Sequence, residues 1–124
     1  MEQSILIVDD EADLVGLYKI VLQMAGFQVT GTTSGRQALI HVQDQTPDLI
    51  LLDVMMPEIS GIEVCKKIRS LALDKQPIVF MYSANDSYEN KDRCLNAGAD
   101  RLISKSVPVD AVTEEIRLVL PVSG

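Results

Sequence analysis

Two uninterrupted apolar stretches constrain the fold of this chain more than any other feature. They read LILL at residues 49–52 and IVFMY at residues 78–82, and a polar residue ends each one. Continuous apolar runs of this length are typical of strands that are covered on both faces, as in a parallel sheet between helices. Because a membrane span needs about 20 apolar residues, these runs indicate the buried strands of a globular domain.

Strand and helix patterns alternate along the chain. Residues 4–8 (SILIV) predict a strand, and apolar residues then recur at helical spacing from Leu14 to Ala25. Gly26 is expected to end this helix, because glycine tolerates the left-handed conformation of a helix end. The later segments are expected as follows: a strand at 27–30, a helix from Ser34 that breaks at Thr46 and Pro47, a strand at 49–53, a helix from Gly61, a strand at 78–83, a polar helix ending near Gly98, a strand at 100–105 and a helix from Pro108.

Short connections and buried strands together predict the fold class. A parallel sheet needs right-handed crossovers, which place helices on both of its faces. We therefore expect an α/β protein with a doubly wound, five-stranded parallel sheet. Since one hydrophobic core serves roughly 100–200 residues, residues 1–124 are expected to form one domain.

The charge of the chain argues against some classes of partner. Lys and Arg number 11 against 18 Asp and Glu, which leaves a formal net charge of -7. This is the wrong sign for direct binding to nucleic acid or to an anionic membrane. The start, MEQSILIVDDE, has neither the basic residues nor the cleavage site of a signal peptide. We expect a cytoplasmic protein without direct contact to nucleic acid or membrane.

Polar side chains follow the predicted strands, at the places where functional groups gather in an open parallel sheet. These residues are Asp9, Asp10 and Glu11 after the first strand, Asp53 after the third, Ser83 after the fourth and Lys105 after the fifth. Because the carboxyl ends of parallel strands meet at one edge, we expect these side chains to face a common crevice.

Clustered carboxylates raise one another's pKa unless a cation lies between them. Mg²⁺ suits such a cluster, since it binds one or two carboxylates and keeps positions for water and phosphate oxygens. With Mg²⁺ bound, Asp53 can act as a nucleophile toward phosphorus and form an acyl phosphate. Lys105 and Ser83 could then hold the phosphoryl oxygens.

Each of these residues has a simpler interpretation when it is taken alone. Asp10 could cap the first helix, a common role for Asp before an apolar periodic run. Lys105 could be a solvated surface lysine, and Ser83 a strand-end hydroxyl that the backbone satisfies. The combination at successive strand ends favours the metal and phosphoryl interpretation.

The motifs LIVDDE, LLDVMMPEISG, MYSA and SK occur in this order at successive strand ends. They resemble the CheY-like receiver domain of two-component response regulators, and the resemblance covers essentially the whole chain. It implies a flavodoxin-like fold with strand order 2-1-3-4-5. It also implies that Asp53 is the phosphoacceptor, that Asp10, Asp53 and the backbone carbonyl of Met55 bind Mg²⁺, and that Asp9 acts largely through water.

The resemblance further implies that Lys105 neutralises the phosphoryl group and that the hydroxyl of Ser83 turns toward it on activation. Two positions depart from the family pattern. Ser106 follows Lys105 where receivers usually carry Pro in a cis peptide, so the loop either holds a costly non-proline cis bond or takes a trans path. Leu102 stands where receivers commonly have Tyr or Phe, and leucine has no ring that could rotate on activation.

The expected function is a phosphorylation-controlled switch rather than an enzyme acting on other substrates. A histidine kinase or a histidine phosphotransfer protein would phosphorylate Asp53, and the added charge would alter the surface of the fourth helix, fifth strand and fifth helix. The output would be a downstream protein target or a fused output domain, and phosphorylation-linked dimerisation is left open.

Three other functions share parts of this pattern. A Mg²⁺-dependent phosphatase with an aspartyl nucleophile would need a second Asp two positions later, where this chain has Met55. A flavodoxin-like electron carrier leaves the strand-end acids unexplained, because they would repel its anionic phosphate. A phosphorylation-independent interaction module would follow if the two departures disable the switch.

Overall fold

The structure is a computed structural model that describes residues 3–85 and 87–121. Strands and helices alternate strictly within them. The strands are β1 (Ser4–Val8), β2 (Gln28–Thr32), β3 (Leu49–Asp53), β4 (Ile78–Ser83) and β5 (Arg101–Ser104). The helices are α1 (Ala12–Met24), α2 (Gly35–Asp44), α3 (Gly61–Ser70), α4 (Tyr88–Asn96) and α5 (Val109–Val119).

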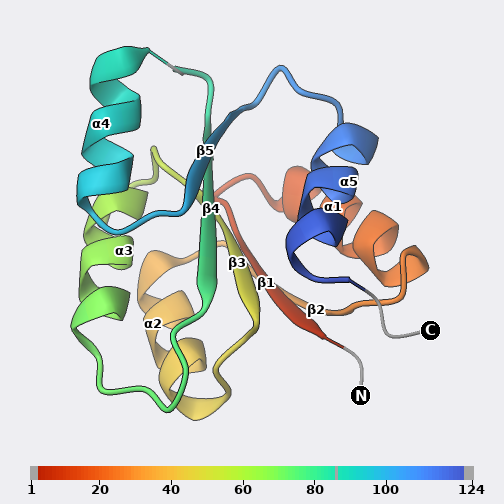
Figure 1. Ribbon diagram of the computed structural model, residues 1–124, viewed down its shortest axis with the longest axis horizontal. Helices are drawn as coiled ribbons and strands as arrows, with labels where there is room; N and C mark the ends of the chain where they lie inside the picture. Colours follow the sequence, from red (N-terminus) through yellow and green to blue (C-terminus); the bar gives the residue numbers. More distant parts are fainter. Residues whose placement is uncertain (1–2, 86, 122–124) are drawn as a thin grey trace.

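The strands form one parallel sheet in the order β2-β1-β3-β4-β5. Helices α2, α3 and α4 cover one face of the sheet, and α1 and α5 cover the other (Figure 1). The predicted doubly wound α/β fold and its strand order are therefore confirmed. No helix in the described part of the chain is long and apolar enough to cross a membrane.

The sheet separates two apolar layers. Leu6, Ile50 and Met81 belong to the layer on the side of α2, α3 and α4, whereas Ile7 and Leu51 belong to the layer on the side of α1 and α5. Neighbouring residues of one strand enter different layers because successive side chains of a strand point to opposite faces. All residues of β3 are buried, as the run LILL predicts.

Most predicted boundaries agree with the structure to within one or two residues. Gly26 and Gly98 follow α1 and α4 with φ of 101° and 104°, the left-handed region that glycine adopts at low cost. Strand β2 extends two residues beyond the predicted segment 27–30, and β5 is shorter than the predicted segment 100–105. Strand ends depend on pairing with neighbours, which local sequence signals do not specify.

Candidate functional site

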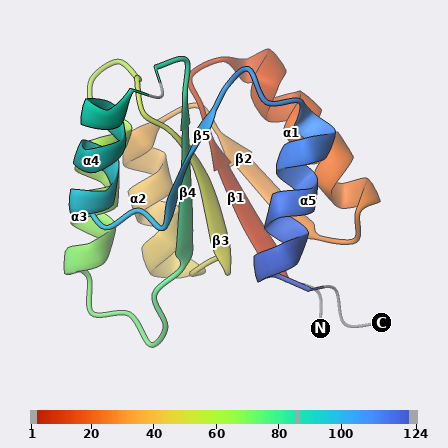
Figure 2. The same cartoon turned by 45° about the horizontal axis from the view of Figure 1, so that its top comes forward.

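The loops that follow β1, β3, β4 and β5 meet at one edge of the sheet, at the top of the view in Figure 2. Asp9 and Asp10 follow β1, and Asp53 is the last residue of β3. One carboxylate oxygen from each of the three residues lies within 4.8 Å of the others. Asp9 and Asp53 are buried and Asp10 is exposed. The structure thus brings the predicted acidic residues together.

Lys105 supplies positive charge to this cluster. Its Nζ lies 3.2 Å from Oδ2 of Asp9, 3.3 Å from Oδ2 of Asp53 and 3.8 Å from Oε1 of Glu11. The main chain of the loop is fixed as well, because the backbone N–H of Lys105 donates to the carbonyl oxygen of Ser83 over 2.8 Å. A single ammonium group therefore bridges carboxylates at the ends of two different strands.

The electrostatics of the cluster favour a further cation. Burial raises the pKa of Asp53 to about 6 and the charge of Asp9 adds to the rise, while Lys105 and the Met55 amide oppose it. Burial lowers the pKa of Lys105, but Asp53 and Asp9 outweigh burial and raise it overall. The raised pKa of Asp53 means that one lysine does not fully compensate the carboxylates.

The backbone around Asp53 is held closely. The Met55 N–H donates to Oδ1 of Asp53 over 3.2 Å, and the Gly61 N–H donates to the carbonyl oxygen of Val54 over 2.9 Å. A Cβ on Gly61 would lie 2.0 Å from the carbonyl oxygen of Asp53, so only glycine lets α3 begin this close to the end of β3. The side chain of Met55 is exposed, and its carbonyl oxygen as a metal ligand stays a prediction.

The acids after β1 do not cap α1. The N-cap residue is Glu11, and its side chain makes no capping hydrogen bond. The backbone N–H of Glu11 instead donates to Oδ1 of Asp9 over 2.8 Å. Interpreting Asp10 as a helix cap is therefore wrong.

Ser83 lies at the same edge, and its hydroxyl is hydrogen-bonded to the loop before α4. It is buried, and its Oγ accepts the backbone N–H of Asn85 over 3.0 Å. None of the hydrogen bonds found in the described residues joins this hydroxyl to Asp53 or to the ammonium of Lys105. In this structure Ser83 is near the cluster and outside its network of charges.

Comparison with known proteins shows which family the chain belongs to. Residues 5–117 match the family model of the response regulator receiver domain. The chain belongs to this family. The receiver is 38% identical over 97% of its length to the Bacillus subtilis alkaline phosphatase synthesis transcriptional regulatory protein PhoP. It is 34% identical over 98% of its length to the Pseudomonas aeruginosa phosphate regulon transcriptional regulatory protein PhoB.

Solved receivers share the same fold. The chemotaxis response regulator CheY4 of Vibrio cholerae superposes with a TM-score of 0.89 and 28% identity, covering 96% of this chain and 99% of that one. The BeF3-activated N-terminal receiver domain of Klebsiella pneumoniae RstA superposes with a TM-score of 0.86 and 27% identity, covering 96% of this chain and 99% of that one. The receiver covers 49% of PhoP and 53% of PhoB, so it spans about half the length of these curated relatives.

The structure shows how the chain accommodates the two departures from the family pattern, Ser106 and Leu102. No cis peptide bond occurs in the described residues, so the bond between Lys105 and Ser106 takes the trans path. The hydroxyls of Ser104 and Ser106 lie 2.8 Å apart, and the N–H of Val107 donates to the carbonyl of Ser104 over 3.0 Å, which closes the turn. Leu102 packs, half-buried, against the apolar layer under α2, α3 and α4.

Tyr82 is a site residue that the sequence reasoning missed. Its hydroxyl donates to Oδ2 of Asp9, and its ring lies 4.9 Å from Nζ of Lys105 and packs edge-on against Tyr18 at 5.9 Å. Burial, followed by the hydrogen bond to Asp9, raises the pKa of Tyr82. The sequence presented it as one residue of an apolar strand. The available signal was that a buried tyrosine needs a partner for its hydroxyl.

The residues at this edge fit a magnesium ion. The cluster offers carboxylate oxygens, which are the ligands that hard divalent cations prefer, and the exposed Asp10 leaves it open to solvent. Buried Asp53 carries a raised pKa that a divalent charge would lower. The donor set and the charge balance thus both suit Mg²⁺.

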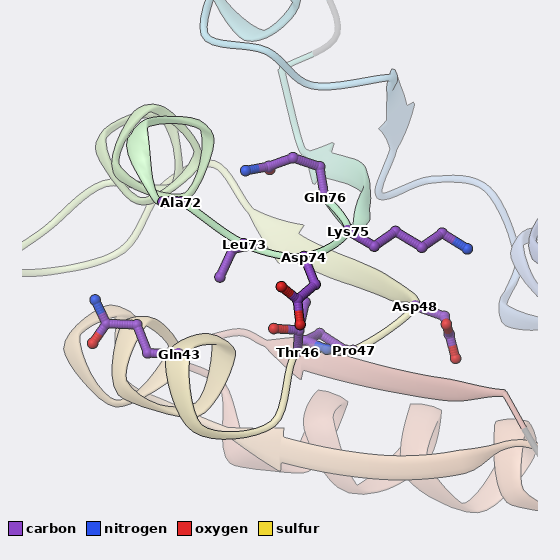
Figure 3. Close-up of a pocket in the computed structure, with 9 residues that line it drawn as sticks. All are labelled: Gln43, Thr46, Pro47, Asp48, Ala72, Leu73, Asp74, Lys75 and Gln76. Carbon is purple, nitrogen blue, oxygen red and sulfur yellow. The ribbon is translucent and has the colours of Figure 1, made fainter.

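A separate hollow of about 310 Å³ lies at the opposite edge, among the connections that precede β3 and β4 (Figure 3). Three of its polar side chains, those of Thr46, Asp48 and Gln76, bond to other parts of the chain. Oδ2 of Asp48 accepts the N–H of Ser4 over 2.8 Å, and Nε2 of Gln76 donates to the carbonyls of Ile68 and Leu71 over 3.2 Å. We therefore place the candidate site at the acidic edge.

Proposed function

We propose that this receiver is a phosphorylation-dependent switch that accepts a phosphoryl group on Asp53. The observation that carries the proposal is the setting of this carboxylate: buried at the end of β3, within 3.3 Å of Lys105 and beside Asp9 and Asp10. A pKa of about 6 leaves Asp53 ionised at neutral pH and able to act as a nucleophile.

The phosphoryl donor is a phosphohistidine of a histidine kinase or of a histidine phosphotransfer protein. A carboxylate oxygen of Asp53 attacks phosphorus and forms the new P–O bond. The P–N bond of the donor breaks, and its electron pair stays on the imidazole, which leaves as neutral histidine after protonation. The chain takes part in its own phosphorylation without turning over a separate substrate.

The other residues of the edge position and neutralise the group. Asp10, Asp53 and the Met55 carbonyl would hold Mg²⁺ with Asp9 assisting through water, and the metal supplies positive charge to the phosphoryl oxygens. Lys105 adds a second positive charge, 3.3 Å from Oδ2 of Asp53. Ser83 would exchange its bond with Asn85 for one to the phosphoryl group.

The relatives and the net charge of the chain indicate what this domain acts on. PhoP and PhoB are named transcriptional regulators, and the receiver spans about half of each. We propose that residues 1–124 act as one regulatory domain on a fused output domain or on a separate protein target, through the surface of α4, β5 and α5. With a net charge of -7, direct contact with DNA belongs to an output module rather than to this domain.

Intact-mass measurement with acetyl phosphate tests the proposal. Wild type should gain one phosphoryl mass in the presence of Mg²⁺ and none in EDTA. Asp53→Asn should gain none, whereas the exposed control Asp74→Asn should behave as wild type. Labelling of Asp53→Asn would contradict the assignment of the phosphoacceptor.

Absence of labelling in all samples would instead favour a phosphorylation-independent interaction module. Sustained release of phosphate from small phosphate esters would favour a phosphatase. The position of the general acid in that class is occupied here by Met55, so we expect no such turnover.

A further inference from the structure

We propose that Tyr82 is a positioning residue for the acidic edge, which holds the carboxylate of Asp9 in the orientation that divalent metal binding requires. The inference rests on the proposed function, because it concerns the same cluster. It adds Tyr82, a buried residue of β4 that lies within the motif MYSA but was given no role in the predicted site.

The first argument is the state of Asp9. Its side chain is 0% exposed, so the protein must supply its hydrogen-bond donors. Oδ1 accepts the N–H of Glu11, while Oδ2 accepts the hydroxyl of Tyr82 and lies 3.2 Å from Nζ of Lys105. A buried carboxylate that loses a donor pays a desolvation cost and is free to rotate toward other partners.

The second argument is that Lys105 cannot hold Asp9 alone. Its ammonium lies almost equally far from Asp9 and Asp53, at 3.2 Å and 3.3 Å. In the proposed function this ammonium serves the phosphoryl group on Asp53. Tyr82 is the donor to Oδ2 that has no such second role, so it keeps Asp9 in place when Lys105 shifts.

The third argument is that Tyr82 is itself rigidly placed. It is 2% exposed and pairs in register with Asp53 on β3 and with Ile103 on β5. Its ring is held edge-on by Tyr18. A donor fixed by packing and by the sheet can define the direction of the carboxylate that it binds, whereas a donor on a mobile loop cannot.

Substitution of Tyr82 by Phe removes the hydroxyl and keeps the ring. Removal of a group that orients a metal ligand typically weakens metal binding by 10–100-fold. We therefore expect Tyr82→Phe to raise the Kd for Mg²⁺ by about tenfold or more, measured by titration calorimetry on the unphosphorylated full chain. The matched control is Tyr18→Phe, the same change in the ring that contacts Tyr82, for which the described residues show no hydrogen bond to the cluster.

Two further readouts separate positioning from a general loss of stability. In metal-free wild type and in Tyr18→Phe, proton NMR should show a protected tyrosine hydroxyl resonance that is absent in Tyr82→Phe. In an Asp9→Asn background, adding Tyr82→Phe should change the Kd for Mg²⁺ less than twofold, because the residue through which Tyr82 acts is already altered.

The outcomes distinguish this inference from the proposed function. Mg²⁺ binding by wild type with an unchanged Kd in Tyr82→Phe would overturn the positioning role and leave the proposed function intact. A tenfold loss of Mg²⁺ affinity on adding Tyr82→Phe in the Asp9→Asn background would also overturn the positioning role. Failure of wild type to bind Mg²⁺ would contradict both proposals. An equal loss of Mg²⁺ affinity in Tyr18→Phe would show that Tyr82 acts only through packing.

Discussion

Asp53 is a residue whose chemistry lowers the stability of the fold. Its pKa rises from 3.8 to about 6 on folding, so the folded state binds the proton more tightly than the unfolded state does. Between these values the unfolded state releases its proton first, and stability falls as pH rises. Above pH 6 the whole cost in free energy of unfolding remains, about 3 kcal/mol.

Asp53→Asn should therefore be more stable than wild type at neutral pH without metal, and the difference should vanish toward pH 4. Urea denaturation of both proteins across pH 4–8 in EDTA measures this. A difference that does not change with pH would show that the gain has another origin.

Gly61 occupies a position that leaves no room for a side chain. The contact of 2.0 Å between an added Cβ and the carbonyl oxygen of Asp53 requires a backbone shift at the site itself. We expect Gly61→Ala to lose about 2–4 kcal/mol of unfolding free energy and to slow phosphorylation. The control is Gly16→Ala in α1, where an added Cβ meets nothing within 4 Å and should stabilise the helix by about 1 kcal/mol.

At the scale of elements, Arg69 connects α3 to the segments that flank β4 and β5. Its guanidinium donates to the carbonyl of Gly98 over 2.9 Å, to that of Pro77 over 2.7 Å and to Asp100 over 3.1 Å. The same carboxylate oxygen of Asp100 accepts the N–H of Val79 over 2.8 Å, which fixes the start of β4. One side chain thus holds the ends of three elements in register.

Arg69→Met should therefore destabilise the protein by about 2–3 kcal/mol, because it leaves the carbonyls of Gly98 and Pro77 without this donor and removes the ion pair with Asp100. Thermal and urea unfolding measure the loss. Arg36→Met is the control, since its ion pair with Glu58 joins side chains that are 72% and 73% exposed and contributes little. Equal effects of the two substitutions would contradict the bridging role of Arg69.

Sequence patterns predict the elements well because their signals are local. Apolar runs, glycine ends and proline starts identified every strand and helix and placed Asp9, Asp53 and Lys105 at one edge. The bonds of Tyr82 and Arg69 escaped prediction because they join residues 73 and 31 positions apart, to Asp9 and Asp100. Periodicity carries no information about such pairs, which exist only once the sheet has formed.

For the whole molecule, we expect the cluster to couple metal binding to stability. Mg²⁺ that binds the folded state alone stabilises it by mass action, about 2.7 kcal/mol at a hundredfold excess over Kd. We expect Mg²⁺ to raise the melting temperature of wild type more than NaCl of equal ionic strength does, because NaCl only screens the net charge of -7.

Asp10→Asn should weaken this response, since Asp10 is one of the three clustered carboxylates. Differential scanning calorimetry in Mg²⁺, NaCl and EDTA gives the comparison. Equal shifts in Mg²⁺ and NaCl would mean that the acids do not form a shared metal site.

The division of the interior by the sheet also bears on how such a domain can diverge. The layer under α1 and α5 contains Tyr82, whereas the layer under α2, α3 and α4 contains Met81 and touches Leu102. Substitutions that share no contacts act nearly independently on stability. Descendants of one ancestor can therefore repack the layer beneath α4 and alter that part of the partner surface, while the layer that contains Tyr82 and the chemistry at the strand ends are inherited unchanged.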